Sequence, residues 1–128
     1  MSTSAQAFFE TWQSRMHGMK DAPGGADIGR GFAGMFQALM KDGSAAGGLD
    51  AKHKELIALA IGVALRCETC IYAHVEKCIK AGATPREVMD AAGVAVMMGG
   101  GPAYTQMPKV SEALMALHAL PADTASAH

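Results

Sequence analysis

The sequence predicts an all-α fold for a chain of 128 residues that fits a single domain. Half of the residues are hydrophobic although only 5% are aromatic, because alanine and methionine carry much of the apolar content. Such a composition favours packed helices over a β-sandwich. Apolar residues also recur at helical spacing, in stretches separated by glycine-rich segments. One core can form at this length, and oligomerisation is a further source of stability for so small a chain.

Two helices are expected within residues 4–41. The first, residues 4–19, repeats apolar side chains at helical spacing, and we interpret it as a helix that docks on the core rather than as an aromatic substrate site. The segment 21–25 (DAPGG) ends it, and a second helix is expected over residues 27–40. Residues 42–48 then form a flexible link without a phosphate-binding pattern. The side chains that the second helix should turn inward are Ile28, Phe32, Met35, Phe36 and Leu39.

The next two helices are expected to form a central antiparallel pair. Asp50 is a good N-cap for a helix over residues 50–66, and apolar side chains occur on nearly every face of that helix. We therefore expect this helix to be central and buried. The second member of the pair, residues 68–81, ends before Gly82 and should pack against the first.

A capping box predicts the start of another helix. Thr84 is followed by Pro85 and, three residues after Thr84, by Glu87, which is the pattern of a helix N-terminus. The helix should run to about residue 98. Its expected apolar face includes Val88, Ala91, Ala92, Val94, Ala95, Val96 and Met98.

A glycine triplet, residues 99–101, then turns the chain. Such a triplet can hold an anion through its N–H groups, but no lysine or strand accompanies it, and we interpret it as a turn. The last helix, residues 102–117, should bend at Pro108. Residues 121–128 are expected to be a frayed tail.

A C-x-x-C motif stands at the start of the second central helix. The Cα atoms of Cys67 and Cys70, three residues apart on a helix, are expected about 5 to 5.5 Å apart, which a disulfide can span. A thiol near a helix N-terminus is shifted toward the thiolate, and an imidazole one turn further along can accept its proton. Cys70 and His74 are therefore a candidate nucleophile and base. The side chains that share this helix face, within an arc of roughly 80°, are Cys67, Cys70, His74 and Cys78.

Glu55 is a single carboxylate in an otherwise apolar run of the preceding helix. A buried, charged carboxylate without a partner costs on the order of several kcal/mol, so Glu55 should have a partner such as His74, or a raised pKa. The alternative is an exposed carboxylate near the helix start. Cys78 lies about 12 Å of helical rise beyond Cys70, too far to share one zinc ion with it, and we interpret Cys78 as a small buried residue.

The spacing E-x11-C-x2-C-x3-H resembles the alkylhydroperoxidase core of the AhpD-like branch of the carboxymuconolactone decarboxylase family. The similarity continues through the next helix and the glycine-rich turn, and covers about residues 49–118. It implies an AhpD-like helical domain. Carboxymuconolactone decarboxylases proper generally lack the C-x-x-C motif, so their activity is not carried over. The matching reactive residues are Glu55, Cys67, Cys70 and His74.

The resemblance also implies a role for each of these residues. Cys70 would be the attacking thiol, and Cys67 would resolve it as a disulfide. Glu55 and His74 would form a proton relay. AhpD itself has another histidine between the two cysteines, where this chain has Thr69. The family further implies homo-oligomers, trimers or hexamers, with the site near a subunit boundary.

These observations predict a thiol-dependent peroxidase with antioxidant activity. Its partners would be a hydroperoxide substrate and an external dithiol reductant, and we expect neither a cofactor nor a metal. With a net charge of −1 and no cluster of lysines and arginines, the chain is not expected to bind nucleic acid. The N-terminus lacks a basic and then apolar leader, and no run is long and uncharged enough to span a bilayer, so a cytoplasmic protein without membrane attachment is expected.

Two alternatives belong to other functional classes. The first is a non-catalytic metal- or partner-binding helical protein, in which ligands from two helices converge on a metal ion. Its ligands would be Glu55, Cys67, Cys70 and His74. The second is an enzyme of the decarboxylase family that acts on a lactone or small organic acid, for which no substrate-binding group of arginines and lysines is visible.

Overall fold

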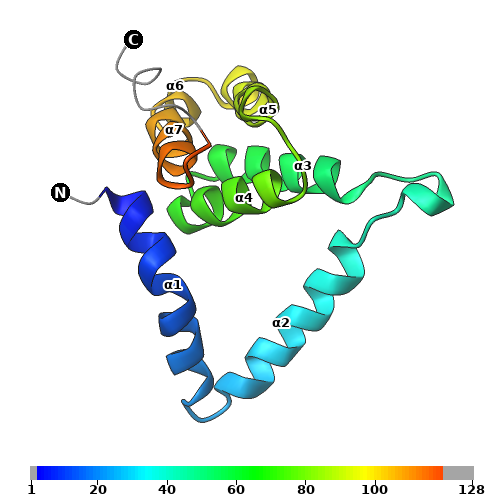
Figure 1. The fold of residues 1–128 in the computed structure, drawn as a ribbon, viewed down its shortest axis with the longest axis vertical. Helices are drawn as coiled ribbons and strands as arrows, with labels where there is room; N and C mark the ends of the chain where they lie inside the picture. The colour runs from blue at the N-terminus through cyan, green and yellow to red at the C-terminus, as the bar shows by residue number, and fades with distance from the viewer. Residues whose placement is uncertain (1–2, 120–128) are drawn as a thin grey trace.

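The structure is a computed structural model that describes residues 3–119, which contain helices and no strand (Figure 1). The all-α prediction is confirmed. The predicted tail, residues 121–128, lies outside the described residues. In chain order the elements are α1 (Ser4–Lys20), α2 (Gly25–Met40), the 3-10 turn η1 (Ser44–Ala46), α3 (Ala51–Ala64), α4 (Glu68–Lys80), α5 (Pro85–Gly99), α6 (Gly101–Tyr104) and α7 (Met107–Ala116).

Side-chain caps fix where α3 and α5 begin. Oδ1 of Asp50 accepts a hydrogen bond from the backbone N–H of His53 at 2.8 Å, which confirms Asp50 as the N-cap of α3. Thr84 and Glu87 form the predicted capping box of α5, since each side chain accepts a hydrogen bond from the backbone N–H of the other. These bonds satisfy N–H groups that the first helical turn leaves without an intrahelical partner.

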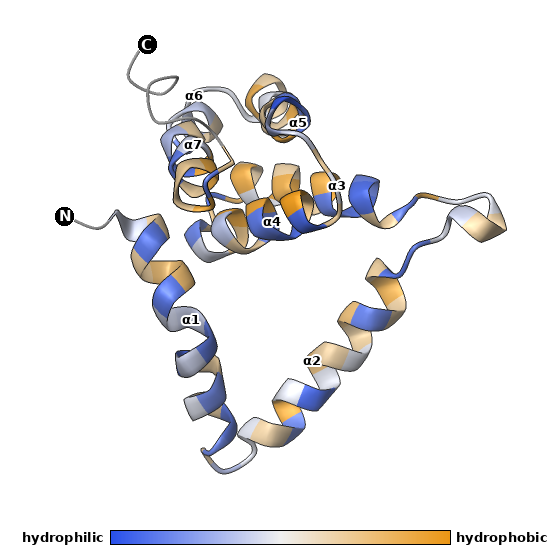
Figure 2. Ribbon diagram, in the orientation of Figure 1, coloured by the Kyte–Doolittle hydropathy of each residue, from blue (hydrophilic) through white to orange (hydrophobic). Residues whose placement is uncertain are grey.

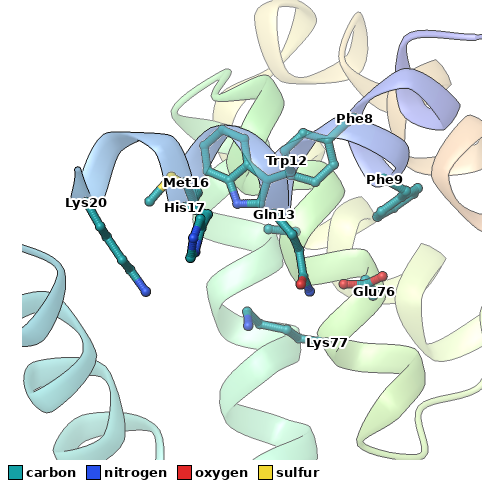
Figure 3. Close-up of a pocket in the computed structure, with 10 residues that line it drawn as sticks. Phe8, Phe9, Trp12, Gln13, Met16, His17, Lys20, Glu76 and Lys77 are labelled. Atoms are coloured by element: carbon teal, nitrogen blue, oxygen red, sulfur yellow. The ribbon is translucent and has the colours of Figure 1, made fainter. Parts of the chain in front are cut away.

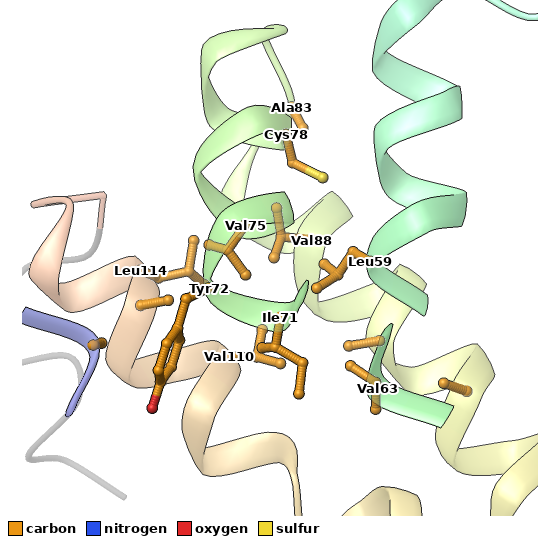
Figure 4. Close-up of a cluster of buried hydrophobic side chains, with 14 of the residues drawn as sticks. Leu59, Val63, Ile71, Tyr72, Val75, Cys78, Ala83, Val88, Val110 and Leu114 are labelled. Carbon is orange, nitrogen blue, oxygen red and sulfur yellow. The ribbon is translucent and has the colours of Figure 1, made fainter. Parts of the chain in front are cut away.

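The predicted central pair is confirmed, because α3 and α4 run side by side in the middle of the helical core (Figure 1). α5 packs mainly on α3, and α7 packs on α4. The interior between these helices is a cluster of apolar side chains (Figure 4), in which each fully buried valine, leucine or isoleucine stabilises the fold by about 1.5–3 kcal/mol. Its largest fully buried members are Tyr72, Leu59, Ile71, Leu114, Val63, Val75, Val88 and Val110.

The N-terminal helix docks on this core through its first turns. Ala5 and Phe8 of α1 are buried, and the ring of Phe8 lies 5.5 Å from the ring of Tyr72 on α4 and 5.0 Å from that of Trp12. Aromatic rings at such separations attract each other beyond their burial. The interpretation of this helix as a docking helix is therefore confirmed.

The prediction that the second helix turns its apolar face inward is wrong for four of the five residues named and holds only for Phe36, which is half-buried and stacks toward His74. α2 diverges from the central pair (Figure 1), and most of the large apolar residues along it (Figure 2) are exposed. Only Gly25 of this helix is buried. The exposed stripe of α2, between 52% and 67% accessible, consists of Ile28, Phe32, Met35 and Leu39.

The expectation that the helix after Asp50 is buried on nearly every side also needs correction. Leu59, Gly62 and Val63 of α3 are buried, but no helix within residues 3–119 covers its opposite face. Val94 and Met98, assigned to the inner face of α5, are exposed as well. The apolar side chains exposed on α3 are Ile57, Ile61 and Leu65.

The last predicted helix is interrupted rather than bent. The chain forms α6 and α7, which are separated at Thr105 and Gln106, and Pro108 lies in the first turn of α7. A proline is tolerated there because the first N–H groups of a helix have no intrahelical acceptor. None of the helices that the structure describes is long and apolar enough to cross a membrane.

Candidate functional site

The connection between α3 and α4 presents the C-x-x-C motif. α3 ends in a Schellman motif, in which the N–H of Arg66 donates to the carbonyl of Val63 and the N–H of Cys67 donates to that of Gly62, both at 3.0 Å. Arg66 takes the left-handed conformation that this motif requires, with φ 57°. Cys67, the last residue of the motif, is also the N-cap of α4. The turn therefore fixes where the first cysteine lies.

Cys67 and Cys70 form a disulfide, with their Cα atoms 5.2 Å apart, as the spacing predicted. Sγ of Cys67 accepts a hydrogen bond from the backbone N–H of Cys70 at 3.3 Å, in the manner of a helix cap. Thr69 places its hydroxyl 3.6 Å from the same sulfur. Both cysteines are half-buried. Unpaired N–H groups at a helix N-terminus favour a thiolate at this position once the disulfide is reduced.

Gly62 sets the distance between the two central helices at Cys70. A Cβ atom on Gly62 would lie 3.1 Å from the Cβ of Cys70, closer than such atoms ordinarily approach. A larger residue at position 62 would require one of the two helices to shift by a few tenths of an ångström. Sequence analysis missed this residue, although a glycine inside an apolar helical run is a signal of close packing.

Glu55 of α3 and His74 of α4 form a buried pair. Nδ1 of His74 lies 2.8 Å from Oε1 of Glu55, and Glu55 is only 8% exposed. A carboxylate only accepts hydrogen bonds, so it holds the proton on Nδ1 and leaves Nε2 of His74 to exchange protons elsewhere. The predicted partnership is confirmed, and the alternative of an exposed carboxylate is wrong.

A pocket of about 420 Å³ opens beside these groups, between α1, α2 and α4. Cys70 and His74 both line it, whereas Cys67 and Glu55 do not. The four predicted site residues are thus gathered in one place, with two of them facing the space that a small molecule could enter. The other lining residues are Trp12, Met16, Phe32, Ala33, Phe36, Gln37, Thr69, Ala73 and Lys77.

α2 forms the outer wall of this pocket and is held at its two ends. At its N-terminus, Gly25 packs so closely on Met19 that a Cβ atom would meet the Met19 carbonyl oxygen. At its C-terminus, Nζ of Lys54 on α3 donates to the carbonyl of Leu39 at 2.9 Å. In between, the ring of Phe36 stacks toward His74 with centroids 6.5 Å apart. Sequence analysis did not place α2 at the site.

A second pocket, of about 390 Å³, adjoins the first along α1 and α4 (Figure 3). It shares Trp12, Met16, Ala73 and Lys77 with the first pocket but contains no cysteine. Charged and polar side chains, among them Lys20 and Glu76, surround it. We therefore place the candidate chemistry in the first pocket, which we call the thiol pocket.

Cys78 faces the core and takes no part in the site. It is fully buried within the apolar cluster (Figure 4), and burial, with a smaller contribution from the negative charge of Glu55, raises the pKa of its thiol to about 12. The interpretation of Cys78 as a small buried residue is confirmed. Within residues 3–119, no group of three or more His, Cys, Asp or Glu side chains is arranged to hold a metal ion.

Comparison with known proteins identifies relatives that match part of this chain in sequence. An uncharacterised protein of the cox locus of Paracoccus denitrificans is 37% identical over 85 residues, which are 66% of this chain and 73% of the relative. An uncharacterised protein of Haemophilus influenzae is 42% identical over 72 residues, which are 54% of this chain and 62% of that protein.

Two solved structures share the fold. A carboxymuconolactone decarboxylase family protein from Legionella pneumophila superposes with a TM-score of 0.75 at 33% identity, over 91% of this chain and 96% of that one. A family member from Thermotoga maritima, for which an involvement in an antioxidative response has been suggested, gives a TM-score of 0.63 at 28% identity, over 71% of this chain and 90% of that one. The model of the carboxymuconolactone decarboxylase family matches residues 26–118, so that α2 is included in the match. The chain belongs to the carboxymuconolactone decarboxylase family.

Proposed function

We propose that this protein is a thiol-dependent peroxidase that reduces hydroperoxides through the Cys67–Cys70 pair. The family includes both decarboxylases and alkylhydroperoxidases, and the C-x-x-C motif favours the second activity. The observation that carries the proposal is the arrangement of the thiol pocket. Cys70 and His74 line its wall together, and Glu55 contacts His74 at 2.8 Å.

The reaction begins with the reduced pair. The Cys70 thiolate attacks the terminal peroxide oxygen, the O–O bond breaks, and the leaving alkoxide takes a proton from His74 and departs as an alcohol. The sulfur is oxidised to a sulfenic acid. Glu55 supports His74 by accepting the hydrogen bond from its Nδ1–H, which fixes the orientation of the ring.

The second step closes the disulfide. The Cys67 sulfur attacks the sulfenic sulfur of Cys70, and the hydroxyl group leaves as water, so that one hydroperoxide is reduced to an alcohol and water per pair of thiols. An external dithiol then attacks the disulfide by thiol exchange, regenerates both thiols and leaves as its own disulfide. A C-x-x-C pair that needs such a donor suits a reducing compartment, and we propose a cytoplasmic location.

We also propose that the protein works as a homo-oligomer, a trimer or hexamer as the family resemblance implies. Apolar stripes on α2 and α3 support this, because contiguous exposed apolar surface of this kind marks interaction sites. Ile61→Glu would place a charge in the middle of the α3 stripe. Light scattering should then give a smaller mass than for the unmodified chain, and an unchanged mass would remove α3 from the interface.

Hydroperoxide consumption by the reduced protein, measured with a panel of dithiol donors, tests the peroxidase proposal. One equivalent of cumene hydroperoxide should oxidise one Cys67–Cys70 pair, and excess dithiol should make the reaction catalytic. A sulfenic-acid reagent should label Cys67→Ser but not Cys70→Ser. Labelling of Cys70→Ser alone would exchange the two roles, and an absence of hydroperoxide consumption would remove the activity.

A further inference from the structure

A cation on the wall of the thiol pocket has no part in the proposed thiol chemistry. Lys77 of α4 lies three residues after His74 and seven after Cys70. Seven residues of an α-helix advance about 10.5 Å and return to within about 20° of the same direction. The thiol, the imidazole and the ammonium group therefore follow one stripe of α4, and all three residues line the thiol pocket.

The ammonium group of Lys77 is held by an aromatic ring and not by an acid. Nζ lies 4.9 Å from the centroid of the Phe36 ring, at a distance typical of cation–π contacts. No ion pair of Lys77 with a carboxylate is present in residues 3–119, and the neighbouring Glu76 pairs with Lys80 at 3.6 Å. Lys77 is half-buried. Its charge is thus partly removed from water but not neutralised, which favours an anionic ligand.

The rest of the thiol pocket suits a hydrocarbon. Among the described residues that line it there is no aspartate or glutamate to repel an anion. Besides Lys77, only His74 and Cys70 of the lining can ionise, and most of the lining is apolar or aromatic. Its apolar and aromatic side chains include Trp12, Met16, Phe32 and Phe36.

We propose that the substrate is an amphipathic hydroperoxide with a carboxylate, of the class of fatty-acid hydroperoxides. Its carboxylate pairs with Lys77, its hydrocarbon chain lies against Phe32 and Phe36, and its hydroperoxide group reaches Cys70. The product is the corresponding hydroxy acid, formed by the steps given above. Lys77 is a specificity-determining residue that does not touch the reacting atoms. This inference rests on the proposed peroxidase function.

Steady-state kinetics with a matched pair of substrates tests the role of Lys77. Linoleic acid hydroperoxide and its methyl ester differ in the charge that Lys77 would recognise, and tert-butyl hydroperoxide lacks both the charge and the chain. Lys77→Gln should raise KM for the acid about fivefold, as expected for a partly exposed charge pair, and leave kcat nearly unchanged. KM for the ester and for tert-butyl hydroperoxide should stay as they are.

Two control variants sharpen this test. Lys80→Gln removes the same charge one turn away on the exposed side of α4 and should leave KM for the acid unchanged. Lys77→Arg keeps the charge and should restore most of the preference for the acid. Equal KM changes for acid and ester, or an equal effect of Lys80→Gln, would overturn the assignment.

A binding measurement separates this inference from the peroxidase proposal. Trp12 is the only tryptophan of the chain and lines the thiol pocket, so its fluorescence reports binding without turnover. Hydroxyoctadecadienoic acid, added to the oxidised protein, should quench Trp12 saturably, about fivefold less tightly in Lys77→Gln, and its methyl ester should not distinguish the variants. Quenching that depends on Lys77, without any peroxidase activity, would support the ligand and reject the reaction. Peroxidase activity with acid binding unaffected by Lys77→Gln would reject the ligand alone.

Discussion

α4 and α2 are both amphipathic helices, yet the molecule uses their apolar faces differently. The inward residues of α4 are at most 1% exposed, whereas the stripe of α2 is more than half exposed. The difference does not lie in the residues themselves, since both helices repeat large apolar side chains at helical spacing. The difference lies in how many neighbouring helices contact each of the two. α4 meets α3, α7 and α1 within the same chain, while α2 touches its neighbours mainly at its ends.

The two faces of α4 also have different roles. One face of the helix fills the core, and the other face carries Cys70, His74 and Lys77 into the thiol pocket. α2 supplies the opposite wall of that pocket through Phe32 and Phe36. A rigid helix therefore holds the reactive groups, and a less tightly packed helix covers them. Such a division suits a site that must admit a ligand and still keep its thiols in place.

The largest expected difference is between the two faces of α4, in the reactivity of their thiols. Cys78 has a pKa of about 12 against an ordinary value of 9.0, so at pH 8 its thiolate fraction should be about 10³-fold below that of an ordinary thiol. Iodoacetamide, followed by mass spectrometry of the reduced native protein, should modify Cys67 and Cys70 but not Cys78. Modification of Cys78 should begin only when a denaturant unfolds the chain. Equal labelling of all three cysteines in the native state would contradict the assignment.

Truncation of matched isoleucines compares α4 and α2 directly. Ile71→Ala, at a fully buried position of α4, should lower the free energy of unfolding by about 2–5 kcal/mol. Ile28→Ala, at a position of α2 that is 67% exposed, should change it by less than about 0.5 kcal/mol in the dissociated chain. Urea denaturation at several protein concentrations measures both. A large effect of Ile28→Ala that grows with protein concentration would show that another copy covers the α2 stripe.

A substitution of Glu55 tests whether α3 contributes to the reactivity of Cys70 as well as to the packing of the core. Glu55→Gln keeps an oxygen that can accept the hydrogen bond from His74 but removes the negative charge. It should leave the fold and most of the thermal stability intact and slow the alkylation or oxidation of Cys70 near neutral pH about 10²-fold. Stopped-flow kinetics across pH, with circular dichroism as the control for folding, measures the effect. An unchanged pH–rate profile would remove Glu55 from the site.

Effects of about 1 kcal/mol or less on stability are expected from substitutions of two glycines in helix interiors. Gly93→Ala, at an exposed position of α5 with open space around it, should stabilise the protein by about 0.5–1 kcal/mol. Gly62→Ala should gain the same helix propensity but crowd Cys70, for a net loss of about 1 kcal/mol. The rate of Cys70 oxidation should fall only in the second variant. If both variants are equally stable and reactive, close packing at Gly62 has no functional role.

Interactions between residues near in sequence were predictable, and those that depend on distant partners were less so. The spacing of Cys67, Cys70 and His74 fixes their common helix face, so the disulfide followed from helix geometry alone. The pairing of Glu55 with His74 was also predictable, because a carboxylate in an apolar run needs a partner. Both inferences use constraints that hold within one helix or between consecutive helices.

The residues that line the thiol pocket could not be predicted from constraints within one helix or between consecutive helices. The periodicity of α2 indicates an apolar stripe but not whether this chain, another copy or a ligand covers it. The break at Thr105 and Gln106 was missed for a related reason, since Pro108 is compatible with both a bend and a helix start. Whether a cation is neutralised likewise depends on neighbours from several elements, so Lys77 could be assigned only once the helices were placed.

Cys67 is the last residue of the Schellman motif that ends α3 and is also the N-cap of α4. Insertions and deletions on either side of it are therefore restricted. A residue inserted between Gly62 and Cys67 would break the hydrogen bond that closes α3, and one inserted between Cys67 and Cys70 would separate the cap from its helix. The link between α2 and α3, residues 41–50, is closed by its own hydrogen bonds, such as that from the N–H of Gly43 to the carbonyl of Leu49, and contributes no residue to the site. We expect insertions and deletions among functional variants to accumulate in that link, while the interval from Glu55 to His74 keeps its length.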